Sequence, residues 1–160
     1  DQLGHVKFFC FYLVCGVLAS LCQWSVAPES PIPSLGASGA IAGVMGAYIF
    51  RFPQVRVLTF VPIFFTAFRV PALLFLGFWF VEQAFYGVTS LGAAADVGMG
   101  GGVAYWAHAC GFVIGFALVI PMWLRRGGPA YWNRTEGHPP HPEAKYKIVR
   151  TSVPNVRRDR

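Results

Sequence analysis

Residues 36–48 read Gly-Ala-Ser-Gly-Ala-Ile-Ala-Gly-Val-Met-Gly-Ala-Tyr, a run of small residues with one serine near its start. Small residues recur at intervals of four, as in Gly39-x-x-x-Gly43, and this spacing lets neighbouring helices approach closely in lipid. Three prolines in residues 25–35 prevent a helix from starting earlier. The stretch therefore predicts a closely packed helix with Ser38 at its N-terminal end.

The composition indicates a membrane protein. Hydrophobic residues make up 55% of the chain and charged residues 12%, with a mean hydropathy of +0.50. That charged fraction is about half the share usual in soluble proteins. The net charge of +6 arises entirely after residue 124, where nine basic and three acidic residues stand among five prolines. This pattern predicts a membrane domain over residues 1–124 and a disordered basic tail over 125–160, which contacts anionic lipid and not nucleic acid.

Four apolar segments, at about 6–24, 37–52, 71–88 and 103–124, predict an all-α, multi-pass helix bundle. The second segment is short for a bilayer of roughly 30 Å, so it either begins below the membrane surface or lies where the bilayer thins. Residues 53–70 are interrupted by Pro62 and carry Arg56 and Arg69. They favour an interfacial hairpin or a short re-entrant piece over a crossing helix.

The basic residues predict the orientation of the bundle. Lys7 lies at the start of the first segment, basic residues also stand around the connection between the second and third and after the fourth, and the other two connections have none. By the positive-inside rule both chain ends then face the cytoplasm. Ser38 and His108, the histidine that opens the fourth segment, consequently begin helices that run inward from the outer face at matching depth.

This pairing predicts a catalytic function. A serine hydroxyl needs an adjacent base to act as a nucleophile, and histidine is the usual one. Gly111-x-x-x-Gly115 gives the fourth segment its own close-packing face. Serine among small residues is also common where membrane helices simply pack, but ionisable residues at membrane depth are rare and usually functional. We therefore expect Ser38 as nucleophile and His108 as base, with backbone N–H groups near Ser38 stabilising an oxyanion.

Residues 36–48 resemble the active-serine helix of the rhomboid family of intramembrane serine proteases. The run Ala-His-Ala-Cys-Gly-Phe-Val-Ile-Gly at 107–115 resembles the family's active-histidine helix, and residues 3–16 resemble the segment that leads into the preceding helix. The resemblance covers nearly all of residues 1–124. It implies a Ser38–His108 dyad without a third carboxylate and without a metal or organic cofactor. It also implies that the substrates are single-span membrane proteins, cut near the outer face where helix-destabilising residues occur.

The sequence departs from the family pattern in one respect. The family core has six spans, and this chain resembles the last four. A His-x-x-x-Asn pair that helps to hold the oxyanion in the family has no counterpart, since His5 is followed by Phe9 four residues later. We therefore expect the C-terminal part of a longer protease in a bacterial plasma membrane, with the tail cytoplasmic. The rival expectations are an inactive relative that binds membrane clients, and a small transporter or scaffold in which Ser38 has no special reactivity. Nothing in the pattern sets the oligomeric state.

Other residues are weaker candidates. Glu82, in the third segment, is either functional or a protonated packing residue. We expect the neighbouring Trp79 and Phe80 to be bulky side chains that face lipid, and the alternative is that they form a gate for substrate entry. Cysteines 10, 15, 22 and 110 favour buried thiols over a disulfide framework or a metal site. His138 and His141 alone do not make a metal site, and Asn133 begins a glycosylation sequon whose predicted cytoplasmic place argues against its use.

Overall fold

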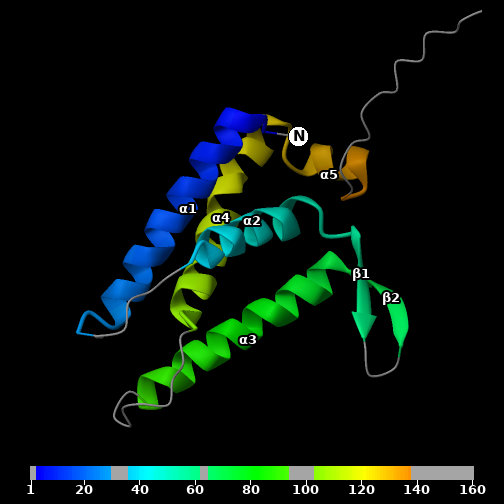
Figure 1. The fold of residues 1–160 in the computed structure, drawn as a ribbon. Helices are drawn as coiled ribbons and strands as arrows, with labels where there is room; N and C mark the ends of the chain where they lie inside the picture. Colours follow the sequence, from blue (N-terminus) through cyan, green and yellow to red (C-terminus); the bar gives the residue numbers. More distant parts are fainter. Residues whose placement is uncertain (1–2, 30–35, 62–64, 94–102, 138–160) are drawn as a thin grey trace, which may run out of the picture.

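The fold is a helix bundle with one β-hairpin, seen in a computed structural model that describes residues 3–29, 36–61, 65–93 and 103–137 (Figure 1). The elements within these residues are α1 (His5–Val26), α2 (Ser38–Arg51), β1 (Arg56–Val61), β2 (Thr66–Pro71), α3 (Ala72–Ala93), α4 (Tyr105–Arg125) and α5 (Pro129–Thr135). The predicted mainly helical architecture is therefore confirmed.

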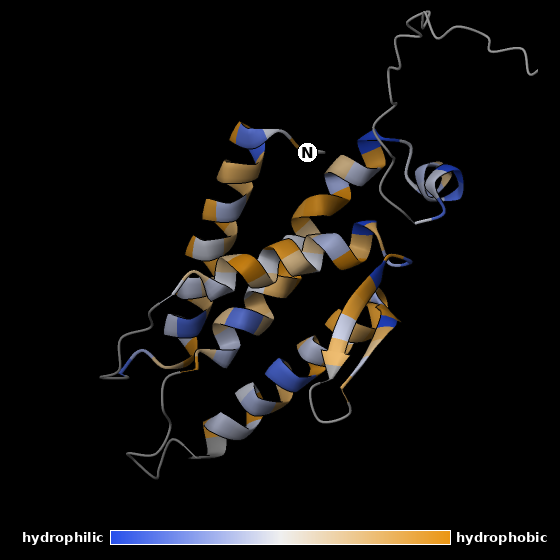
Figure 2. Cartoon of the chain, turned by 45° about the vertical axis from the view of Figure 1, so that its right-hand side comes forward, coloured by the Kyte–Doolittle hydropathy of each residue, from blue (hydrophilic) through white to orange (hydrophobic). Residues whose placement is uncertain are grey.

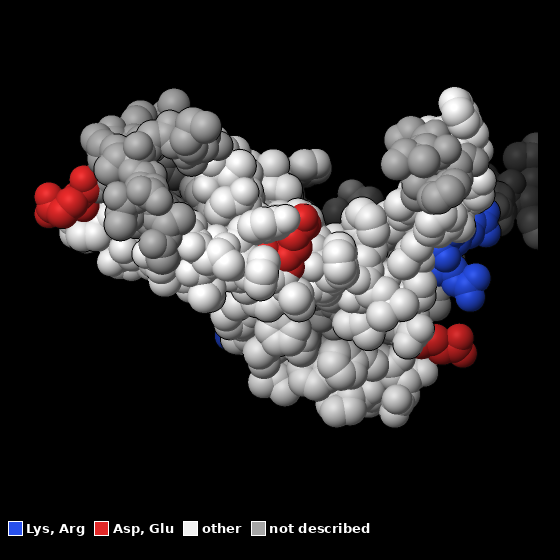
Figure 3. Space-filling view, turned by 90° about the horizontal axis from the view of Figure 1, so that it is seen from below, with Lys and Arg blue, Asp and Glu red and all other residues white. Residues whose placement is uncertain are grey.

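Three helices in the described part of the chain are long and apolar enough to cross a membrane, namely α1, α3 and α4. Hydrophobic residues extend along these helices, and a short hydrophilic segment interrupts α3 (Figure 2). The face seen from below in Figure 3 is almost entirely uncharged. Helix α2 has only 14 residues, about 21 Å at 1.5 Å per residue, so it is shorter than a bilayer core.

Helices α2 and α4 form the centre of the bundle, with α1 and α3 on either side of them (Figure 1). Their backbones touch: a Cβ atom added to Gly111 would collide with the carbonyl oxygen of Gly39, and one added to Gly115 would collide with that of Gly43. The two pairs advance together along both chains, so the helices run parallel. The predicted close packing of these two small-residue faces is thereby confirmed.

Helix α1 meets this centre through small residues as well. Cys15 and Ala19, one turn apart, are its buried residues. A Cβ atom added to Gly43 would lie 2.6 Å from the Cβ atom of Cys15, and one added to Gly39 would lie 2.8 Å from that of Ala19. Helices α1 and α4 therefore both pack against α2 near Ser38 only because glycine occupies these positions.

Strands β1 and β2 pair antiparallel, which agrees with the hairpin, one of the two alternatives expected for residues 53–70. Arg56 of β1 pairs with Pro71 of β2 at the open end, and Val61 pairs with Thr66 next to the turn. Helix α3 follows the hairpin directly. The backbone N–H of Ala72 donates to the carbonyl of Val55 over 2.6 Å, so the hairpin holds the start of α3 close to the end of α2.

Part of the tail is ordered, so the expectation of disorder throughout 125–160 is wrong. Residues 129–135 form α5, in which Tyr131 is buried, with 4% of its surface exposed. The Tyr131 hydroxyl accepts a hydrogen bond from Arg51 over 3.2 Å, and Trp132 contacts Phe50 and Trp123. This contact joins the end of α2 to the end of α4, which the charge pattern placed on the same side. Residues 138–160, with His138 and His141, lie outside the described residues.

The cysteines also correct the sequence-based expectation. Cys22, in the last turn of α1, and Cys110, in α4, form a disulfide with a Cα–Cα distance of 6.4 Å. Cys15 is a buried thiol as expected, but Cys10 is exposed. The expectation that all four are buried free thiols is therefore wrong for three of them: Cys10 is exposed, and the sequence separation of 88 conceals that Cys22 and Cys110 are close.

Candidate active site

Ser38 and His108 meet at the end of the bundle where α2 and α4 begin. The Oγ atom of Ser38 lies 2.7 Å from Nε2 of His108, within hydrogen-bond distance. Ser38 is the first residue of α2 and is exposed, whereas His108 is in the first turn of α4 and half-buried. The parallel glycine contacts further along the two helices set this register. A hydroxyl and an imidazole at this distance have the geometry in which the imidazole can take the hydroxyl proton.

The second nitrogen of His108 has a partner that sequence reasoning did not identify. Oε1 of Gln83, in α3, lies 2.8 Å from Nδ1 of His108. An amide oxygen is only an acceptor, so this contact is a hydrogen bond in the tautomer that has the proton on Nδ1 and leaves the lone pair of Nε2 toward Ser38. An amide within an apolar segment indicates a buried polar contact, but the sequence-based candidate was its charged neighbour Glu82. Gln83 is buried, whereas Glu82 is half-buried.

A second glutamine holds the start of α4. Ala104, the N-cap residue, makes no side-chain hydrogen bond to the helix. Oε1 of Gln23 in α1 instead accepts a hydrogen bond from the backbone N–H of Ala107 over 3.1 Å. The first N–H groups of a helix lack partners within it, and one supplied from another helix fixes the helix end in place. Side chains from α1, α2 and α3 thus converge on the turn that carries His108.

Aromatic side chains of α3 cover the other side of His108. The Trp79 ring lies 5.8 Å from the imidazole, and Phe80 stacks on Phe112 of α4 at 4.8 Å. Both side chains are half-buried, whereas Phe78 is 74% exposed. The expectation that Trp79 and Phe80 are lipid-facing bulk is therefore wrong, because α3 turns them toward α4 and Phe78 away from it.

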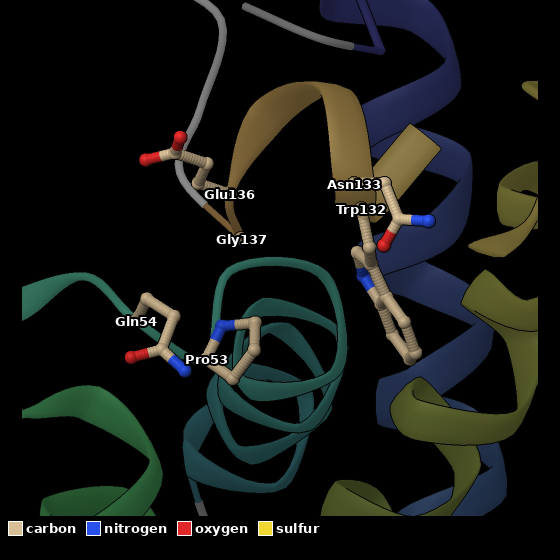
Figure 4. A pocket seen from close by; sticks show the side chains of 6 residues that line it. All are labelled: Pro53, Gln54, Trp132, Asn133, Glu136 and Gly137. Atoms are coloured by element: carbon tan, nitrogen blue, oxygen red, sulfur yellow. The ribbon is translucent and has the colours of Figure 1, made fainter. Parts of the chain in front are cut away.

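A groove of about 590 Å³ opens beside Ser38. It runs between α1 and the first turn of α2 and is largely apolar, with Ser20 and Tyr12 among its polar lining residues. A second hollow lies at the opposite end of α2, where Pro53 and Gln54 face Trp132 and Glu136 (Figure 4). Only the first hollow contains Ser38, so an extended peptide segment could reach the serine along it.

Glu82 takes no part in this arrangement. Among the described residues, Glu82 makes no hydrogen bond or ion pair with the dyad, and no group of three or more His, Cys, Asp or Glu side chains could hold a metal ion. The polar partner that α3 contributes is the neutral Gln83. Burying an amide costs less than burying a carboxylate when each has one hydrogen bond.

Comparisons with known proteins agree with the helical membrane fold. The family model "Rhomboid domain" matches residues 1–125. Rhomboid protein 1, mitochondrial, of Saccharomyces cerevisiae is 35% identical over 118 residues, which cover 71% of this chain and 30% of the yeast protein. No solved structure matches this chain. The chain belongs to the rhomboid domain family, and it spans about a third of the length of the curated relative it matches.

Proposed function

We propose that this chain carries the catalytic dyad of an intramembrane serine endopeptidase. The observation that supports the proposal is the 2.7 Å distance between Oγ of Ser38 and Nε2 of His108 at the end of two closely packed membrane helices. Membership of the rhomboid domain family agrees with this function. The chain spans 30% of the length of its yeast relative.

In the proposed reaction, Oγ of Ser38 attacks the scissile carbonyl while Nε2 of His108 takes its proton. The carbonyl becomes an oxyanion, which accepts hydrogen bonds from backbone N–H groups at the start of α2. These groups have no acceptor within the helix, because the helix begins at Ser38. When the tetrahedral intermediate collapses, His108 gives the proton to the leaving amine and an acyl-enzyme remains.

Water then completes the cycle. His108 takes a proton from a water molecule, which attacks the acyl carbon, and then gives that proton to Oγ of Ser38 as the ester bond breaks and the carboxyl product leaves. Ser38 is exposed and lines the groove, so water can reach it. The steps use side chains, backbone N–H groups and water, with no metal or organic cofactor.

The proposed substrates are single-span membrane proteins that become extended near the outer membrane face. An extended segment exposes its backbone carbonyls, whereas an intact helix hides them in hydrogen bonds. The groove beside Ser38 suits such a segment because its lining is largely apolar. The orientation with Ser38 outward and the tail cytoplasmic remains a prediction from charge. The expectation of a bacterial plasma membrane has no support in the comparisons, and the yeast relative is named as mitochondrial.

A fluorophosphonate probe tests the dyad in the full-length protein. We expect covalent labelling of the wild type, and loss of both labelling and cleavage of a single-span reporter in Ser38→Ala and His108→Ala. Ser20→Ala is the matched control, because Ser20 lines the same groove without contacting His108. Equal labelling of wild type and Ser38→Ala would contradict the proposal. Probe labelling without cleavage of any single-span reporter would contradict the proposed substrate class.

A further inference from the structure

Gln83 is the residue of α3 best placed to act on His108. Its side chain is 7% exposed and belongs to the inward face of α3, with Ala72 and Leu76. These other buried positions are apolar, so the amide stands out. A buried amide without a hydrogen bond is costly, and Oε1 of Gln83 has Nδ1 of His108 at 2.8 Å.

The contact decides which nitrogen of His108 can act as a base. A neutral imidazole carries one proton, on Nδ1 or on Nε2. With the proton on Nε2, that nitrogen could not accept the Ser38 proton, and the Nδ1 lone pair would face the oxygen of Gln83. With the proton on Nδ1, both contacts of His108 are hydrogen bonds. The Gln83 oxygen therefore favours the tautomer that the proposed reaction requires.

We propose that Gln83 is a positioning residue that keeps the Nδ1 proton on His108 and thereby leaves Nε2 free to take the proton of Ser38. This inference rests on the proposed function. When Nε2 is protonated during the reaction, the same oxygen still accepts from Nδ1, so the ring keeps its orientation through both proton transfers. The neutral amide holds the ring without placing a charge inside the bundle, where a carboxylate would be costly.

The position of Gln83 on α3 gives the contact a further consequence. Ser38 and His108 are held by the backbone contact of α2 with α4, whereas Gln83 reaches His108 from a helix that packs on α4 through side chains such as Phe80. The Ser38–His108 distance can thus survive a change at Gln83 that removes the tautomer control. This separation makes the inference testable apart from the fold.

Substitution of Gln83 in the full-length protein tests the inference. Gln83→Met keeps the length of an unbranched side chain and removes the amide, and Gln83→Glu keeps an oxygen acceptor at the same reach. We expect kcat on a single-span reporter to fall about tenfold in Gln83→Met, roughly the effect of one neutral hydrogen bond, with KM unchanged. Gln83→Glu should recover most of that loss. Gln54→Leu, at an exposed glutamine far from Ser38, is the control and should retain wild-type kcat.

Nitrogen-15 NMR of labelled histidine gives a readout that a purely structural role would not change. The His108 signals are assigned by their loss in His108→Ala. We expect the wild type to show protonated Nδ1 and unprotonated Nε2, and Gln83→Met to show a mixture of tautomers. A wild type protonated at Nε2 would overturn the inference even if no variant folds. So would Gln83→Met with unchanged kcat and tautomer. If Ser38→Ala instead cleaves like the wild type, the proposed function fails, and the tautomer measurement still reports on Gln83 separately.

Discussion

Helix α4 makes two very different contacts at the site. Against α2 it packs backbone to backbone, with Gly111 and Gly115 facing the carbonyl oxygens of Gly39 and Gly43. Against α3 it packs through side chains, including Phe112 with Phe80 and His108 with Gln83. The first contact fixes the distance between Ser38 and His108, and the second is the one proposed to set which nitrogen of His108 carries the proton.

The difference follows from what each contact can tolerate. Two backbones in contact leave no room for an added methyl group, so the α2–α4 contact has one geometry. Side chains can change rotamer and repack, so the α3–α4 contact adjusts when one residue changes. Substitutions at the α2–α4 contact should therefore lower stability and activity together. Substitutions at the α3–α4 contact should be able to change one without the other.

The largest effect is expected at the backbone contact. The new methyl group of Gly115→Ala would collide with the carbonyl oxygen of Gly43 and push α2 away from α4. We expect a loss of about 3 kcal/mol in the free energy of unfolding, at the upper end for overpacking. Activity should disappear because Ser38 and His108 separate. Thermal unfolding in detergent measures the change, and an unaltered midpoint would show that the helices are not in backbone contact.

The next effect concerns the disulfide that joins α1 to α4. Replacing Cys22 and Cys110 together by serine removes a cross-link over 88 residues, and we expect a loss of about 2 kcal/mol. Cys10→Ser is the control, because Cys10 is an exposed free thiol. Alkylation before and after reduction, followed by mass spectrometry, detects the bond. Modification of both Cys22 and Cys110 without reduction would show that the bond is absent.

A smaller effect is expected at the far end of α2. Tyr131→Phe keeps the buried ring and removes the hydroxyl that accepts from Arg51, so the cost should be about 1 kcal/mol. Activity should change little, because Ser38 is at the other end of α2. Asn133→Ala, at an exposed residue of the same helix, is the control for thermal unfolding. A variant as stable as the control would show that the hydrogen bond between Arg51 and Tyr131 does not contribute to the free energy of unfolding.

The smallest effect is expected on α3. A methyl group added at Gly77 would lie 4.0 Å from the Cδ1 atom of Ile49, an ordinary van der Waals contact. Gly77→Ala should therefore be neutral or stabilise the protein by about 0.5 kcal/mol, because alanine loses less backbone entropy in a helix. Thermal unfolding of Gly77→Ala and Gly115→Ala under the same conditions compares the two contacts directly. A destabilisation equal to that of Gly115→Ala would contradict the difference between them.

The sequence predicted the centre of the fold because small-residue spacing has a direct physical meaning. Glycines four residues apart make one flat helix face, and two such faces predict a close parallel pair. Matching depth then predicted that Ser38 and His108 meet. The short length of α2 was also predictable from residue count, and the proline and arginines in residues 56–69 excluded a crossing helix without deciding between a hairpin and a re-entrant piece.

The glutamine contact was not predictable in the same way. Consecutive residues on a helix point about 100° apart, so either Glu82 or Gln83 could have faced the dyad. A helix that is apolar on most of its surface gives no periodic signal for its rotation. The packing of Leu76 and Phe80 against the bundle sets that rotation, and it turns Gln83 inward.

The sequence by itself therefore determined the membrane setting, the helical architecture and the pairing of Ser38 with His108, because hydropathy, charge and small-residue spacing act locally. Only the tertiary structure decided the disulfide and the ordering of α5, a helix of seven residues that is too short to be stable alone. It also decided the partner of Nδ1. These features depend on contacts between residues far apart in the chain, and the spacing of residues along one helix does not predict such contacts.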